Sequence, residues 1–123
     1  MLKSKKILVV DDEEDFLSLI KYAMEERGFD ILASSSAIDA GIQISMHVPA
    51  LILMDLKMPG INGFQACEAI KKNPATKDIP IIVVSALSDE SDMRKARNIG
   101  IVDYFVKPVN IERLIQRIKE VTA

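Results

Sequence analysis

The chain has 123 residues, of which 49% are apolar and 28% charged, and its formal net charge is −2. These values indicate one globular domain over residues 1–123, and they exclude disorder and direct nucleic-acid binding through a basic surface. The lone cysteine, Cys67, excludes a disulfide framework. Residues 1–5 form a short lead-in, and the apolar run after them is too short for a signal peptide or a membrane span. We therefore expect a cytoplasmic protein without a membrane segment.

The first predicted element is a buried strand at Ile7 to Val10, a continuously apolar and β-branched run. Apolar residues at helical spacing follow from Phe16 to Met24, and Gly28 provides the helix stop. Strand and helix are therefore joined by a short acidic segment.

The acidic segment contains five carboxylates: Asp11, Asp12, Glu13, Glu14 and Asp15. Carboxylates in the first turn of a helix stabilise it through the helix dipole, and this explains Glu13, Glu14 and Asp15. It does not explain Asp11 and Asp12, because they leave a buried strand directly and repel each other. These two residues are candidates for a functional site.

The remaining elements alternate between strands and helices, with Ser34-Ser-Ser36 as an N-cap before the second helix. In order they are a strand at 29–33, a helix at 37–47, a strand at 51–54, a helix at 64–71, a strand at 80–85, a helix at 89–98, a strand at 102–106 and a helix at 111–121. Cys67 shares a helical face with Phe64 and Ile70, which indicates packing and not nucleophilic chemistry. The helix at 89–98 is the least apolar and is expected to be the most loosely held.

Five strands alternating with five helices predict an α/β fold with a mostly parallel sheet. The first, third and fourth strands are apolar throughout, as expected for strands covered on both faces, whereas the second and fifth suit the edges. This pattern predicts the doubly wound, flavodoxin-like strand order 2-1-3-4-5, with helices on both faces.

Polar side chains follow the central strands where each strand ends: Asp11 and Asp12, Asp55, Ser85 and Lys107. The third strand delivers the single carboxylate of Asp55, and the Pro59-Gly60 pair then turns the chain into a loop. Carboxyl ends of parallel strands lie at one edge of a sheet, where ligands bind in doubly wound folds. We therefore expect these side chains to form one site.

The charges of this predicted site indicate its chemistry. Three neighbouring carboxylates stay ionised only beside a hard cation, and oxygen ligands favour Mg²⁺, which also accepts phosphate oxygens. Lys107 and Ser85 would hold a phosphoryl group through an ammonium charge and a hydroxyl donor. Asp55 is the plausible nucleophile, and its attack on phosphorus gives an aspartyl phosphate.

The chain resembles the receiver domains of two-component response regulators over essentially its whole length. The matching features are the acidic pair Asp11-Asp12, the run Met54-Asp-Leu-Lys-Met-Pro-Gly60, the pair Ser85-Ala86 and the run Tyr104-Phe-Val-Lys-Pro108. Each motif is weak alone, and their order and spacing together are specific.

The resemblance implies a phosphoacceptor switch in a phosphorelay. Asp55 would accept the phosphoryl group from a histidine kinase or a histidine phosphotransfer protein. Mg²⁺, or Mn²⁺ in its place, would be held by Asp12, Asp55 and the backbone carbonyl of Lys57, with Asp11 assisting. Lys107 would pair with the phosphoryl group, and its bond to Pro108 would be cis.

The resemblance also implies a conformational output. Ser85 would move to a phosphoryl oxygen with help from the Ala86 amide, and Tyr104 would turn into the space left by Ser85. The simpler interpretation of Tyr104 is packing in a half-buried edge strand. The helix at 89–98, the last strand and the last helix would form the output face, read by an effector domain or protein. The protein would be a monomer or a phosphorylation-dependent dimer.

Two of the positions that depart from the common family pattern concern hydrolysis of the phosphoryl group. Lys57 and Leu87 lie two residues after Asp55 and Ser85, where family side chains flank the path of the attacking water. Neither an ammonium nor an apolar group acts as a base for that water, so slow self-dephosphorylation is expected.

Three other functions are weaker alternatives. A phosphatase of the haloacid dehalogenase kind needs an acidic residue where Lys57 stands. A nucleotide- or flavin-binding module needs a Gly-rich or Ser/Thr-rich phosphate loop after the first strand, which here is acidic. A receiver-like module that only contacts proteins usually lacks one of the site residues, and none is missing here.

Overall fold

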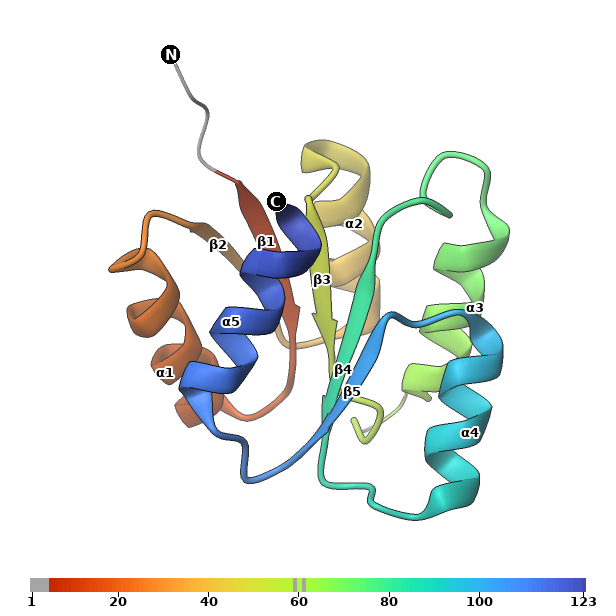
Figure 1. Ribbon diagram of the computed structural model, residues 1–123. Helices are drawn as coiled ribbons and strands as arrows, with labels where there is room; N and C mark the ends of the chain where they lie inside the picture. Colours follow the sequence, from red (N-terminus) through yellow and green to blue (C-terminus); the bar gives the residue numbers. More distant parts are fainter. Residues whose placement is uncertain (1–4, 59, 61) are drawn as a thin grey trace.

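Five parallel strands form one sheet in the order β2-β1-β3-β4-β5, as the sequence predicts (Figure 1). The computed structural model describes residues 5–58, 60 and 62–123. The strands are β1 (Lys6–Val10), β2 (Asp30–Ser34), β3 (Leu51–Met54), β4 (Ile81–Ser85) and β5 (Asp103–Val106). The helices are α1 (Glu14–Glu25), α2 (Ala37–His47), α3 (Gly63–Lys72), α4 (Glu90–Ile99) and α5 (Ile111–Thr122).

The helices cover both faces of the sheet, with α1 and α5 on one side and α2, α3 and α4 on the other (Figure 1). Successive side chains of a strand point to opposite faces, so β1 contributes to two separate cores. Ile7 and Val9 belong to the core under α1 and α5, whereas Leu8 and Val10 belong to the core under the other three helices. This two-sided burial explains why the central strands are apolar throughout.

Local chemistry explains where several helices begin and end. Ser36 caps α2 by accepting a hydrogen bond from the Asp39 amide at 3.2 Å, and Asn62 caps α3 by accepting one from the Phe64 amide at 2.8 Å. Gly100 ends α4 with a φ of 111°, a left-handed conformation that glycine adopts without strain. The expected loose attachment of α4 agrees with Ala96 being the only residue of that helix that is fully buried.

The predicted element boundaries differ from the observed ones by one or two residues. Strand β2 extends to Ser34, which was expected in the cap, because Ser34 pairs with Val10 and accepts a hydrogen bond from the Asp11 amide at 3.0 Å. Residues 1–4 of the expected lead-in and Pro59 of the expected turn lie outside the described residues. Lys5 is not a free lead-in, because its carbonyl accepts a hydrogen bond from the Asp30 amide at 2.9 Å.

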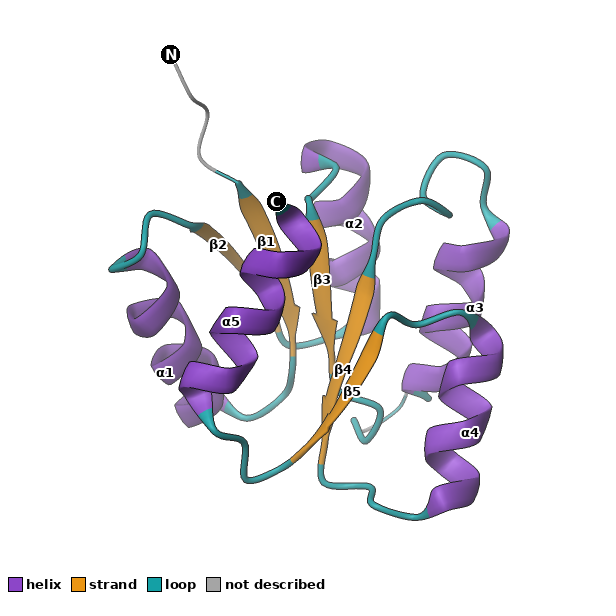
Figure 2. Cartoon of the chain, viewed as in Figure 1, coloured by secondary structure: helices purple, strands orange, loops and turns teal. Residues whose placement is uncertain are grey.

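The loops after β1, β3, β4 and β5 emerge at the same end of the sheet, at the bottom of Figure 2. Cys67 is buried in the core beside Phe64 and Ile70, as predicted, and desolvation raises the pKa of its thiol to about 12. Across the described part of the chain, every helix is too short or too polar to span a lipid bilayer.

Candidate functional site

Two buried aspartates lie side by side at the ends of β1 and β3. Val10 and Met54 are register partners in the sheet, and the Asp55 amide donates a hydrogen bond to the Val10 carbonyl at 3.0 Å. The next residue of each strand, Asp11 or Asp55, is therefore placed at the same sheet edge. Together with Asp12, these residues offer ligand atoms that all lie within 4.8 Å of one another.

Backbone amides orient both buried carboxylates. The Glu13 amide donates to Asp11 Oδ1 at 2.9 Å, and the Lys57 amide donates to Asp55 Oδ1 at 3.0 Å. Each bond closes a short turn in which an aspartate side chain accepts from the backbone two residues later. The Oδ2 atom of each residue is left for partners within the site. Asp12 is exposed, so the site is open to solvent on that side.

Lys107 places its ammonium among these carboxylates. It follows β5, and its amide donates to the Ser85 carbonyl at 2.8 Å. Its Nζ donates to Asp11 Oδ2 at 2.7 Å and lies 3.5 Å from Asp55 Oδ2. The Lys107–Pro108 peptide bond is cis. The ammonium also lies 4.5 Å from the centre of the Phe16 ring, which is within cation–π range.

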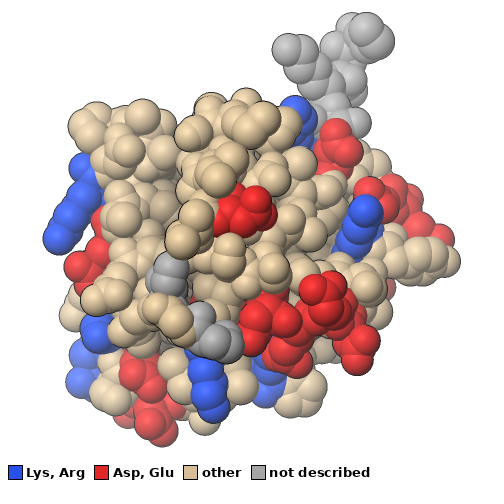
Figure 3. Space-filling model, turned by 180° about the vertical axis from the view of Figure 1, so that it is seen from behind, with Lys and Arg blue, Asp and Glu red and all other residues tan. Residues whose placement is uncertain are grey.

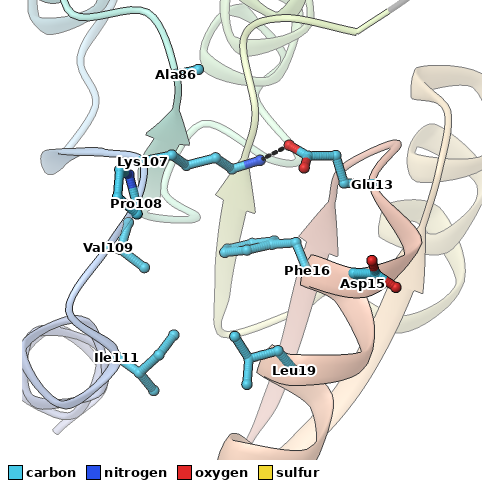
Figure 4. Close-up of a pocket in the computed structure, with 9 residues that line it drawn as sticks. All are labelled: Glu13, Asp15, Phe16, Leu19, Ala86, Lys107, Pro108, Val109 and Ile111. Carbon is cyan, nitrogen blue, oxygen red and sulfur yellow. Dashed lines mark hydrogen bonds and ion pairs between the residues drawn. The ribbon is translucent and has the colours of Figure 1, made fainter.

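Glu13 is part of this site, which the sequence interpretation missed. It was assigned to the helix dipole with Glu14 and Asp15, but its Oε1 accepts a hydrogen bond from Lys107 Nζ at 2.7 Å (Figure 4). Glu13 is the N-cap residue of α1 and its side chain makes no capping hydrogen bond. Its non-helical backbone turns the side chain towards the end of β5 instead of along the helix.

The buried charges perturb each other. Desolvation raises the pKa of Asp11, the neighbouring Asp55 charge raises it further, and the hydrogen bond from Lys107 opposes both. For Lys107, burial acts to lower the pKa, but the hydrogen bonds to Asp11 and Glu13 outweigh it and the net pKa is raised. The Lys107 ammonium thus lies against three carboxylates, those of Asp11, Glu13 and Asp55, which leaves an excess of negative charge at the site.

Ser85 and Tyr104 form a second hydrogen-bonded group behind the carboxylates. Ser85 is fully buried, and its Oγ accepts a hydrogen bond from the Leu87 amide at 3.3 Å. The Tyr104 hydroxyl donates to the Leu87 carbonyl at 2.7 Å. Burial raises the pKa of Tyr104, and Asp92 raises it further. Tyr104 is 7% exposed and packs in the core from edge strand β5, so it is more buried than expected, and its role as a switch stays a prediction.

Gly63 allows α3 to begin directly against the backbone that carries Asp55. A Cβ at position 63 would lie 2.5 Å from the Leu56 Cα and 2.6 Å from the Asp55 carbonyl oxygen, closer than such atoms approach. The Gly63 amide donates to the Leu56 carbonyl at 3.2 Å. Only glycine fits this contact, so Gly63 helps to position the Asp55 loop. Nothing in the sequence indicated this role, because a glycine at the start of a helix does not indicate a contact with another segment.

A cavity of about 480 Å³ opens beside Lys107, between α1 and the segment leading into α5. Figure 4 shows Phe16 and Leu19 from α1 facing Val109 and Ile111 across it, with Lys107 and Glu13 at one end. Ala86 also lines this cavity and is exposed. The sequence placed Phe16 on the apolar stripe of α1, and the structure shows it half-buried, packed against the core and lining this cavity.

Comparison with known proteins identifies the family. Residues 7–119 match the family described as the response regulator receiver domain. The chain belongs to this family. Receiver domains are signalling modules of two-component systems and not conventional enzymes.

This receiver domain is 34% identical over 118 residues to protein PilH of Pseudomonas aeruginosa, covering 96% of this chain and 98% of PilH. It is 33% identical over 114 residues to the phosphate regulon transcriptional regulatory protein PhoB of Rhizobium meliloti, covering 93% of this chain and 50% of that protein. The chain spans about half the length of PhoB and of most other curated relatives it matches. A CheY-like receiver domain structure from Methanospirillum hungatei superposes with a TM-score of 0.91 at 28% identity, covering 98% of this chain and 94% of that chain.

The carboxylate cluster fits the divalent cation that the family implies. Asp11 and Asp55 are buried, Asp12 is exposed, and their oxygens are close enough to share one ion. Carboxylate oxygens are the preferred ligands of hard divalent cations. The excess negative charge around Lys107 is a second observation in favour of a cation at this position.

Proposed function

We propose that this receiver domain is a phosphoacceptor switch in which Asp55 receives a phosphoryl group from a histidine kinase or a histidine phosphotransfer protein. The observation that carries the proposal is the position of Asp55 Oδ2, a buried carboxylate oxygen 3.5 Å from Lys107 Nζ. The adjacent acidic cluster gives the site the charge to bind a divalent cation. Phosphoryl transfer depends mainly on positioning and on charge stabilisation, and these residues supply both.

The chemistry requires one oxygen nucleophile and several positive groups around the transferred phosphoryl. An oxygen of Asp55 forms the new bond to phosphorus as the bond to the donor histidine nitrogen breaks, and that nitrogen keeps the electron pair. Lys107 pairs with a phosphoryl oxygen. Asp11, Asp12, Asp55 and the Lys57 carbonyl would hold Mg²⁺, which would neutralise charge on the phosphoryl oxygens.

The hydrogen-bonded group behind Asp55 supports a conformational response. A phosphoryl group adds about −1.5 to −2 charge, and it draws the Ser85 hydroxyl and the Ala86 amide towards it. Ser85 then releases the Leu87 amide, and the Leu87 carbonyl already holds Tyr104. The loop before α4 therefore moves with Ser85. Because α4 is weakly packed, the population of the α4–β5–α5 face shifts and is read by an effector.

The two departures from the family pattern support a long phosphorylated lifetime. The Lys57 side chain is exposed, and Leu87 has both backbone groups engaged in hydrogen bonds. Neither side chain supplies a base for a water attacking phosphorus. A lifetime of only seconds would contradict this part of the proposal.

Intact mass spectrometry tests the phosphoacceptor. The protein is incubated with phosphoramidate in Mg²⁺ or in EDTA, and Asp55→Asn is compared with Asp78→Asn, which changes an exposed aspartate outside the site. One added phosphoryl group that requires Mg²⁺, persists in Asp78→Asn and is absent from Asp55→Asn supports the proposal. No adduct under any condition would instead indicate a module that contacts proteins without phosphorylation.

A further inference from the structure

Helix α2 exposes an apolar ridge that the proposed phosphorylation does not use. Ile38, Ile42 and Met46 recur every four residues, so they lie on one side of the helix. They are 74%, 52% and 69% exposed. The exposed positions between them, Gly41 and Ser45, carry no charge. The face that contains α2 and α3 is turned to the viewer in Figure 3, where the middle of the upper part is uncharged around one acidic group and further charged groups lie at the edges.

A groove runs beside this ridge, between α2 and α3. Its two parts have volumes of about 310 and 430 Å³ and share Gly41, Ile44, Ala69 and Ile70 in their walls. Most of its lining residues are small or apolar, with Gln65, Asn73 and Thr76 as polar members, and Ala66 continues the wall on α3. The ridge and the groove are therefore neighbours on one face of the molecule.

Two residues of this region, Gly41 and Val48, make the isolated chain less stable. Gly41 lies in the middle of α2, where alanine is more favourable, and a Cβ there would meet nothing within 4 Å. Val48 caps α2 with a φ of 43°, a left-handed conformation that β-branched residues avoid, and it is 63% exposed. Packing within the chain explains neither residue. Close approach of another molecule explains Gly41, because the missing side chain leaves the groove open.

We propose that the α2 ridge and the α2–α3 groove form a homodimer interface, in which the ridge of each copy packs into the groove of the other. A two-fold axis brings the same surface together from both copies, so each must offer a projection and a matching depression. The ridge of Ile38, Ile42 and Met46 and the adjacent groove meet this requirement. Asp39 is the only Asp, Glu, Lys or Arg in α2, and its carboxylate accepts a hydrogen bond from the Ser34 hydroxyl at 2.6 Å, so each copy brings a single carboxylate of α2 to this contact.

The size of the surface indicates a weak, reversible dimer. The three ridge residues and Val48 present roughly 400 Å² of apolar area, which lies within the range of about 300–600 Å² for the largest apolar patch of a typical monomer. A standard stable interface buries about 800 Å² on each partner, so the ridge needs the groove walls to approach that size. This surface is separate from the α4–β5–α5 face and contains no site residue. The dimer therefore forms without phosphorylation, and the inference stands independently of the proposed function.

Sedimentation velocity without a phosphodonor tests the interface, from about 10 μM to about 1 mM, where small interfaces associate. We expect the mass to rise from 13.7 kDa towards twice that value. Ile42→Lys places like charges across the axis and is expected to weaken association about tenfold or more. Gly41→Gln fills the groove and has the same effect, although it favours the helix and keeps the monomer folded.

Val102→Lys is the matched control, because Val102 is an exposed apolar residue, 39% accessible, beside β5. This variant is expected to associate as the wild type does. In ¹⁵N spectra, amide shifts that change with concentration are expected at residues 38–48 and 65–76. A mass that stays at 13.7 kDa up to about 1 mM overturns the proposal. The proposal is also overturned if Val102→Lys abolishes association and Ile42→Lys leaves it intact.

Discussion

Glu13 holds the ammonium that a phosphoryl group on Asp55 must recruit, so neutralising Glu13 is expected to favour phosphorylation. Lys107 Nζ lies 2.7 Å from Glu13 Oε1 and 2.7 Å from Asp11 Oδ2, but 3.5 Å from Asp55 Oδ2. The Glu13 side chain is 61% exposed and that of Lys107 only 12%. Exposed ion pairs contribute about 0.2–1 kcal/mol, and the low exposure of the lysine places this pair near the upper value.

A free-energy change of about 1 kcal/mol corresponds to roughly a fivefold change in an equilibrium constant. Glu13→Gln keeps the hydrogen-bonding shape and removes the charge, so we expect a gain of about two- to fivefold in affinity for beryllofluoride. Removing a carboxylate also weakens cation binding, so the experiment uses saturating Mg²⁺ to isolate the effect on Lys107. Because the chain has no tryptophan, binding is followed by NMR and phosphorylation by intact mass.

Glu14→Gln is the matched control for this experiment. Glu14 is exposed in the first turn of α1, and no ion pair among the described residues includes it. It tests whether any loss of acidic charge near the helix start has the same effect. Unchanged or weaker beryllofluoride binding by Glu13→Gln at saturating Mg²⁺ would refute the competition between Glu13 and the phosphoryl group for Lys107.

Three further predictions concern stability. Gly63→Ala forces a Cβ into the Asp55–Leu56 backbone, so it should lower the free energy of unfolding in urea by about 1–3 kcal/mol and slow phosphorylation. Gly41→Ala should instead stabilise the protein, because a Cβ there meets nothing within 4 Å and alanine favours the helix. Equal stability of the two variants would contradict this. Val48→Gly should raise the free energy of unfolding by about 1 kcal/mol, because glycine adopts the left-handed conformation of this position without strain. A lower free energy of unfolding would show that Val48 is not strained. Burial raises the pKa of Cys67 from 9.0 to about 12, so the folded state keeps a proton that the unfolded state releases. The contribution of Cys67 to stability is therefore complete below pH 9.0 and declines as the pH rises towards about 12; a Cys67→Ala variant with an equally steep decline would exclude it.

The gathering of the site was predictable because it depends on strand order and direction alone. Asp11, Asp55, Ser85 and Lys107 each end or follow a strand, and a parallel sheet brings such positions to one edge. Apolar runs identify those strands without any long-range information. The side-chain partners could not be predicted in this way, since Lys107 was expected only to pair with a phosphoryl group and in the structure is held by three carboxylates.

The contact between Glu13 and Lys107 was not predicted, because the position of Glu13 at a helix start already explained its charge. An acidic residue at a helix start stabilises the dipole wherever the rest of the chain lies. Its actual partner, Lys107, is 94 residues away and is reached only because the Glu13 backbone is extended at the cap. The role of Gly63 was missed for a similar reason, since it depends on a contact with Leu56 across a loop.

The ridge on α2 shows that the spacing of apolar residues in a helix does not always predict which residues are buried. Ile38, Ile42 and Met46 form one apolar stripe, while Ala40 and Ile44 form another, and either could face a core. Packing against the sheet buries Ala40 and Ile44, which leaves the stripe with the larger side chains in solvent. A helix that is apolar on both sides is common where both sides are covered. The periodicity alone therefore leaves open which stripe meets the sheet, and only the fold shows that Ile38, Ile42 and Met46 form the exposed one, on which the proposed dimer contact is based.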